Sequence, residues 1–224
     1  SWVVAATNDL SDRSNVNAMP AFLANRFVHI PIEYDADVFL EYAHSRGLWP
    51  MISSFVKYRP DAGCRPPKSS AEYAYPTPRS LEKLSRIIGE GEFKAQVERC
   101  RVHSPLVIGV ATANELNAFV RLSSELDVMA MLERPKSAKV SKEPSVRYSL
   151  IGAIHACVKR NPKKLVEPAL ELSRKFTDAK GVLEKEYPYM LMRSMLGDAQ
   201  LVKTLVASSG FKALYDEYST ANVL

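Results

Sequence analysis

The sequence is short of the features that define several large classes of protein. It has three cysteines, Cys64, Cys100 and Cys157, whose odd number and wide spacing favour a reduced, intracellular chain over a disulfide-stapled one. No apolar run approaches the roughly 20 residues of a membrane-spanning helix, and no signal peptide is recognisable. We therefore expect a cytoplasmic protein that does not contact a membrane.

Clustered metal ligands, activated nucleophiles and dense basic blocks are missing as well. Cys100 and His103 form half of a zinc site, but no second pair lies nearby and zinc takes about four ligands. No histidine neighbours a plausible nucleophile, and His155 is expected to be a core residue, so hydrolase chemistry is not predicted. The net charge of +5 suits phosphate-bearing ligands, yet the absence of a basic stripe makes nucleic-acid binding the weaker alternative.

A phosphate-binding loop is also absent from these residues. The sequence contains no Gly-x-x-x-x-Gly-Lys-[Ser/Thr], and none of its glycines is directly followed by lysine. The nearest acidic motif, residues 214–217, has no apolar strand before it and is predicted to be part of a C-terminal helix. We therefore predict that these residues alone hydrolyse no ATP.

Two apolar runs near the start of the chain predict β-strands. Residues 2–6 are rich in valine, as in a strand buried on both faces of a parallel sheet. Residues 27–32 form the second run, in which Pro31 favours a sheet edge. Two strands do not make a stable sheet, so we expect that the chain is cut inside its sheet at the N-terminal end.

Helical periodicity dominates after residue 33, and the apolar content of 46% is sufficient for a proper core. The helices are predicted at about residues 21–25, 35–46, 51–58, 80–88, 93–100, 106–122, 126–132, 146–158, 165–176, 183–196 and 199–207. A segment rich in Pro, Lys and Ser, residues 133–145, is predicted to be a linker. The expected fold is mostly α with a small β remnant, in three regions: 1–33, 34–133 and 134–224.

Three polar side chains stand at positions where phosphate chemistry is common. Asn8 follows the first strand, where an amide can hold an attacking water or a phosphate oxygen. Arg26 lies between a short helix and the second strand, from which a guanidinium can reach a neighbouring subunit. Arg79 begins a helix after a stiff Pro-Thr-Pro lead, and helix N-termini favour anions. Each side chain also has a purely structural interpretation. Asn8 would be a turn residue, Arg26 part of a surface ion pair, and Arg79 a solvated residue at a helix start.

Taken in order, the three segments resemble one family. The run VVAATN (residues 3–8) resembles the sensor 1 strand of AAA+ ATPases, and AFLANRF (residues 21–27) resembles their arginine-finger segment. The run YPTPRSLE (residues 75–82) resembles the sensor 2 helix start of MoxR-type members. The resemblance covers about residues 1–160, and it implies the last strands of an αβα core followed by a helical lid and a helical C-terminal extension.

The resemblance also implies a role for each side chain. Asn8 would place the attacking water, Arg26 would complete the ATP site of a neighbouring subunit, and Arg79 would contact the γ-phosphate of its own subunit. ATP and Mg²⁺ are implied for the complete protein, with neither held tightly by these residues alone. Family members form rings that remodel protein complexes, often with a von Willebrand A-type partner.

The missing nucleotide-binding segments leave room for another function. The Walker A and Walker B segments of the family are missing from these residues, so the chain would supply sensors without a phosphate cradle. The alternative is a non-catalytic helical interaction module, in which residues 146–158 and 183–196 of the C-terminal region would bind a partner helix.

Overall fold

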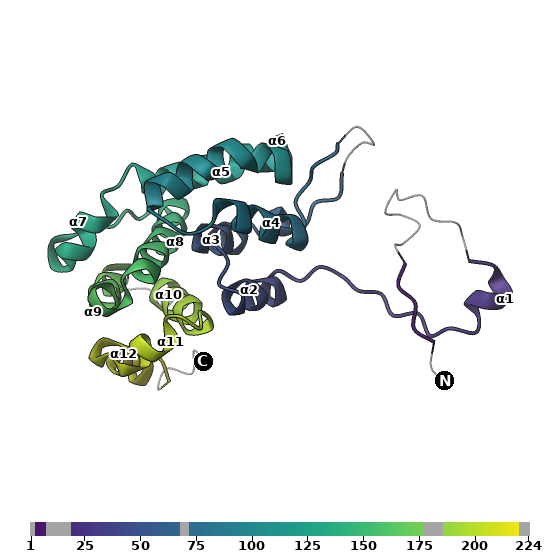
Figure 1. Cartoon of the computed structure of the whole chain (residues 1–224). Coiled ribbons are helices and arrows are strands. Elements are labelled where there is room, and N and C mark those ends of the chain that lie inside the picture. The colour runs from purple at the N-terminus through teal and green to yellow at the C-terminus, as the bar shows by residue number, and fades with distance from the viewer. Residues whose placement is uncertain (1–2, 8–18, 68–71, 177–185, 220–224) are drawn as a thin grey trace.

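The computed structural model describes residues 3–7, 19–67, 72–176 and 186–219, and their regular structure is entirely helical (Figure 1). The α-helices are α1 (Ala21–Ala24), α2 (Ala36–Ser45), α3 (Pro50–Tyr58), α4 (Pro78–Ile88), α5 (Phe93–Ile108), α6 (Val110–Ser124), α7 (Val128–Glu133), α8 (Pro144–Arg160), α9 (Pro162–Ser173), α10 (Glu186–Gly197), α11 (Val202–Ala207) and α12 (Ser209–Ser219). Short 3-10 turns are η2 (Pro60–Gly63), η3 (Pro135–Ser137) and η4 (Arg174–Phe176).

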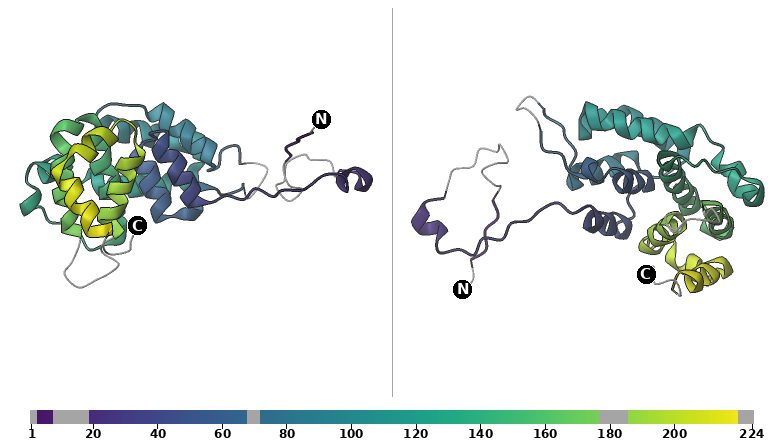
Figure 2. Two further views of the ribbon diagram at one scale, coloured as in Figure 1. Left: turned by 90° about the horizontal axis from the view of Figure 1, so that it is seen from below. Right: turned by 180° about the vertical axis from the view of Figure 1, so that it is seen from behind.

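The expected β remnant is wrong for the part of the chain that the structure describes. Residues 3–7 and 27–33 are not helical, but neither segment is a strand, and the described residues contain no sheet. They belong to an N-terminal arm, comprising residues 3–7 and 19–33, that extends away from the helical body in all views (Figures 1 and 2). A strand requires hydrogen bonds to a neighbouring strand, and the described chain places none beside these segments. The αβα core implied by the resemblance is therefore not part of this structure.

Helix α8 is the centre of the helical body. It packs on α3 and α6 and also contacts α9 and α10, so nearly every residue from Arg147 to Val158 is buried. Gly152 permits the close approach of α3, since a Cβ at this position would lie 2.8 Å from the Ser54 hydroxyl oxygen and 2.9 Å from the Met51 sulfur. The part of α8 that was expected to bind a partner helix is thus covered by the chain itself.

Helices α4, α5 and α6 pack in sequence beside α3. The predicted break between residues 100 and 106 is wrong, because α5 continues through Pro105 to Ile108. The break occurs instead at Gly109, whose φ of 77° is a conformation that residues with a Cβ rarely adopt. Ala74 lies directly against this glycine: a Cβ there would come within 2.4 Å of the Ala74 carbonyl oxygen.

One continuous hydrophobic core runs through the body from α2 to α12. It includes Phe55, Leu84 and Leu116 from the region before residue 134 and Ile154 and Leu191 from the region after it. The division of the chain at residues 33/34 and 133/134 stays a prediction, with a core that crosses the second boundary. Within the described residues, no helix is both long enough and apolar enough to span a membrane.

Candidate functional site

The first turn of α4 is fixed by a reciprocal cap. The Ser80 N–H donates to the Thr77 hydroxyl oxygen at 3.0 Å, and the Thr77 N–H donates to the Ser80 hydroxyl oxygen at 2.8 Å. Pro78 occupies the first helical position, which its fixed φ suits, and Pro76 is buried just before the cap. The backbone that carries Arg79 is therefore rigid.

Arg79 is the second residue of this capped helix. Its side chain is exposed and forms no hydrogen bond or ion pair with any residue that the structure describes. Free N–H groups at a helix N-terminus favour anions, and a guanidinium offers a planar pair of donors to phosphate or carboxylate oxygens. The start of α4 thus presents an uncommitted cation on a rigid base.

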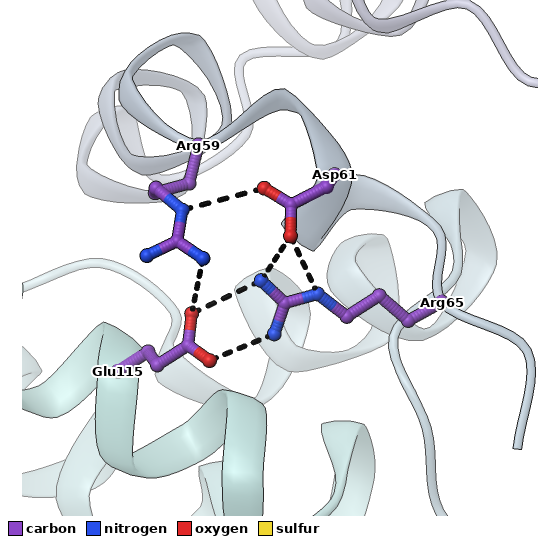
Figure 3. A network of polar contacts seen from close by, with 4 residues as sticks. All are labelled: Arg59, Asp61, Arg65 and Glu115. Carbon is purple, nitrogen blue, oxygen red and sulfur yellow. Dashed lines mark hydrogen bonds and ion pairs between the residues drawn. The ribbon is translucent and has the colours of Figure 1, made fainter. Parts of the chain in front are cut away.

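A four-residue ion-pair network lies beside this helix start (Figure 3). The Arg65 guanidinium donates to both carboxylate oxygens of Glu115 on α6, at 2.9 and 3.1 Å. Arg65 Nε also donates to Asp61 at 3.0 Å, and Arg59 bridges the two carboxylates, at 3.3 Å from Asp61 and 3.6 Å from Glu115. Two arginines and two carboxylates therefore balance in charge.

The network changes the protonation of its members in the expected directions. Hydrogen bonds from Glu115 raise the pKa of Arg65 further above its ordinary value. Partial burial raises the pKa of Asp61, but the hydrogen bonds from Arg65 and Arg59 outweigh it and bring the pKa of Asp61 below its ordinary value. Both shifts favour the charged forms of Arg65 and Asp61.

This network also holds the proline-rich lead of α4. The Arg65 backbone N–H donates to the Pro76 carbonyl oxygen at 3.1 Å, one residue before the Thr77 cap. Two residues further back, Ala74 packs on Gly109 at the junction of α5 and α6. The position of Arg79 is therefore set by contacts with α6 and with the α5–α6 junction. We call the ion-pair network of Arg59, Asp61, Arg65 and Glu115, with its hydrogen bond to Pro76, the brace. Sequence reasoning missed the brace, because Glu115 is separated from Arg65 by 50 positions and no local pattern joins them.

Arg26 lies in a very different setting. It follows α1, a four-residue helix with no buried residue, and its side chain is exposed without a hydrogen bond or ion pair to the described residues. Figure 1 shows α1 at the far end of the arm, away from α4. The structure does not bring Arg26 and Arg79 together, and Asn8 lies outside the described residues.

Among the residues that the structure describes, no group of three or more His, Cys, Asp or Glu side chains is arranged to hold a metal ion.

A second polar cluster is buried between α8 and the end of α10. Asp198 forms an ion pair with Lys159, whose Nζ lies 3.0 Å from the Asp198 carboxylate, and it lies 3.7 Å from His155 Nε2, which is too long for a hydrogen bond. Burial lowers the pKa of His155, so the ring is neutral. Burial raises the pKa of Asp198, but His155, Lys159 and the Gln200 N–H outweigh it and lower the pKa to about 2. His155 is a core residue, as the sequence predicts, and touches no site residue described above.

Comparisons with family models, with curated proteins and with solved structures give no match for this chain. The assignment to a family therefore depends on the three sequence segments alone.

Proposed function

We propose that this chain is the lid portion of an AAA+ ATPase resembling the MoxR type, which couples ATP hydrolysis to the remodelling of protein complexes. The observation that carries the proposal is Arg79, an exposed guanidinium on the capped first turn of α4 that has no partner among the described residues. A residue that neutralises a phosphate needs this combination of a fixed backbone and a free cation. In this proposal Arg79 contacts the γ-phosphate of the nucleotide bound by its own subunit.

Arg26 has the complementary role. It follows α1 on the arm, exposed and without a partner among the described residues, and in this proposal it reaches the nucleotide of a neighbouring subunit. An arginine supplied in this way stabilises the charge that develops in phosphoryl transfer. Asn8 is proposed to hold the attacking water. The phosphate-binding loop and the Mg²⁺ ligands must come from outside these residues, because the sequence has no Walker A motif.

The experiment is a steady-state ATPase assay on the complete protein, comparing Arg79→Ala with Lys83→Ala. Lys83 is an exposed cation one turn further along the same helix, so it controls for loss of surface charge. We expect Arg79→Ala to lower kcat by at least about tenfold, as loss of a charge-assisted contact to phosphate does. Lys83→Ala should keep the wild-type kcat.

Equal kcat values for the two variants and the unaltered protein would remove Arg79 from the mechanism. A similar loss in both variants would indicate a general effect of charge on this helix, and the proposed contact would again be wrong.

A further inference from the structure

A polar pocket lies on the side of the body where α2, α4 and α8 end. Its volume is about 610 Å³, and three arginines stand around it, each from a different helix end: Arg46, Arg86 and Arg160. Neither Arg26 nor Arg79 lines it. The pocket is therefore separate from the helix start on which the proposed function depends.

Three hydrogen bonds connect residues that line the pocket. The Trp49 backbone N–H donates to the Ser85 hydroxyl at 2.8 Å, and the Trp49 indole N–H donates to the Gln96 side-chain oxygen at 3.2 Å. The Gln96 amide in turn donates to the Gly89 carbonyl at 2.8 Å. Because these donors already have acceptors within the chain, this part of the lining is preformed. The three arginines are therefore the groups that would bind a ligand.

The C-terminal ends of helices carry a negative partial charge, which would oppose an anion. Here other cations already offset it. Lys159 Nζ donates to the Gly47 carbonyl oxygen at 2.9 Å, just beyond α2. Arg99 donates to the Ile88 carbonyl at the end of α4 and to the Glu90 carbonyl at 2.8 Å. The three arginines of the pocket are thus not required for neutralising these helix ends.

The arginines are only partly paired with carboxylates. Arg46 forms no ion pair with a described carboxylate, and its guanidinium lies 6.0 Å from the Tyr42 ring centroid. Arg160 contacts Glu92 only at 3.7 Å, with both side chains more than half exposed. Arg86 pairs with Glu82 at 2.6 Å. With Lys159 included, the lining has four basic residues and two acidic ones, Glu82 and Glu90. Lys159 is also paired with Asp198, so Arg46 and the loosely paired Arg160 are the cations that remain available to a ligand.

We propose that this pocket binds a small anion bearing more than one phosphate group, held by Arg46 and Arg160 with support from Arg86. Guanidinium groups approaching from separate helices suit the several oxygens of such a ligand, since each can donate two parallel hydrogen bonds. The site is a binding site, and no bond is made or broken there.

The test is isothermal titration calorimetry of the 224-residue chain with inorganic pyrophosphate at low ionic strength. We expect saturable binding that weakens as salt is added. Arg46→Gln and Arg160→Gln should each weaken it about tenfold, the change expected for loss of one charge-assisted contact. Both side chains are exposed, so the variants should fold, and circular dichroism would verify this.

Two further variants separate this site from other cationic surfaces. Arg121→Gln removes an exposed arginine of α6 that does not line the pocket, and it should bind pyrophosphate as the unaltered chain does. Arg79→Gln removes the side chain on which the proposed function depends, and its titration shows whether the start of α4 binds the anion instead. Absence of binding at millimolar pyrophosphate would overturn the inference, and so would binding that survives both pocket substitutions. Loss in Arg79→Gln alone would transfer the binding to the start of α4 and equally refute the pocket.

Discussion

The N-terminal arm and the helical body contain similar apolar side chains but treat them in opposite ways. In the body, Phe55 is 1% exposed and Leu84 is fully buried, whereas Val28 and Ile32 of the arm are 88% and 94% exposed. The body's apolar residues recur at helical spacing, and each helix finds neighbours within the chain. The arm's apolar residues form a continuous run at 3–6 and alternate at 28, 30 and 32, and in both patterns the covering partner would be another strand or sheet face. The local sequence pattern thus predicts which apolar side chains form one surface. It does not predict whether other residues of the same chain pack against that surface.

The largest effect should come from the arm's arginine. In the complete protein, Arg26→Ala should lower ATP turnover by about 10³-fold or more, because an arginine finger acts mainly in the transition state. Nucleotide binding, measured by equilibrium titration with a fluorescent ATP analogue, should change little. A silent Arg26→Ala would show that the arm's cation has no catalytic role.

The next largest effect should be a difference in the free energy of unfolding between a substitution in the body and one in the arm. Leu84→Ala removes a fully buried side chain from α4 and should lower the free energy of unfolding by about 2–5 kcal/mol. Val28→Ala, on the exposed arm, should change it by no more than about 0.5 kcal/mol. Urea denaturation followed by circular dichroism measures both. If the two substitutions cost the same, the arm is packed against something in this chain, and the contrast between the regions fails.

The partly buried His44 and the buried His155 should make the body sensitive to acid. Burial lowers the pKa of His44 from its ordinary 6.5 to about 4 and lowers that of His155 too, so the unfolded chain binds protons first as pH falls. Stability should therefore decrease below about pH 6.5. The loss of stability that His44 causes levels off below about pH 4, at roughly 3 kcal/mol.

The depressed pKa of Asp198 acts at lower pH. Its carboxylate is favoured in the folded state above about 3.8, and this stabilisation is lost as pH falls toward 2. Urea midpoints between pH 8 and pH 4 test the histidine part, with His44→Gln as the comparison. A midpoint that is flat over this range would contradict the burial of neutral histidines.

The smallest effect should come from the brace behind Arg79. Glu115→Gln should lower the free energy of unfolding by about 1 kcal/mol, since its ion pairs with Arg59 and Arg65 are partly exposed. The difference should shrink at high salt, because screening weakens the pairs in the parent. Glu125→Gln, which breaks one exposed pair with Arg121 on the same helix, is the matched control and should cost less. Equal losses in both variants would mean that the network adds nothing beyond a surface pair.

Sequence reasoning found most of the helices, because caps and stops are local. Asp35 and Asp37 were the two expected caps of α2, and Asp35 is the one that caps it, accepting a hydrogen bond from the Val38 N–H at 3.0 Å. Pro50 begins α3 as expected, whereas α4 begins at Pro78, two residues before its predicted start. The division of α5 from α6 was misplaced, because the actual break depends on the close contact of Gly109 with Ala74.

The wrong prediction of the two strands and the failure to foresee the brace have the same physical cause. A strand is defined by its hydrogen-bonding neighbour and the brace by an ion pair across the fold, and neither leaves a mark in the adjacent residues. Arg79 could be found because its lead, cap and helix are contiguous. Its contact with a nucleotide remains a proposal, as does the role of Arg26.

The most direct test of the account is complementation between subunits in mixed rings of the complete protein. Subunits that carry Arg26→Ala, or separately Arg79→Ala, would be mixed with subunits whose phosphate-binding loop is disabled, and ATP turnover would be measured against mixing ratio. The account predicts that the Arg26→Ala mixture recovers activity, because a loop-disabled neighbour supplies the missing arginine, while the Arg79→Ala mixture does not. Recovery in the Arg79→Ala mixture, or none in the Arg26→Ala mixture, would contradict it.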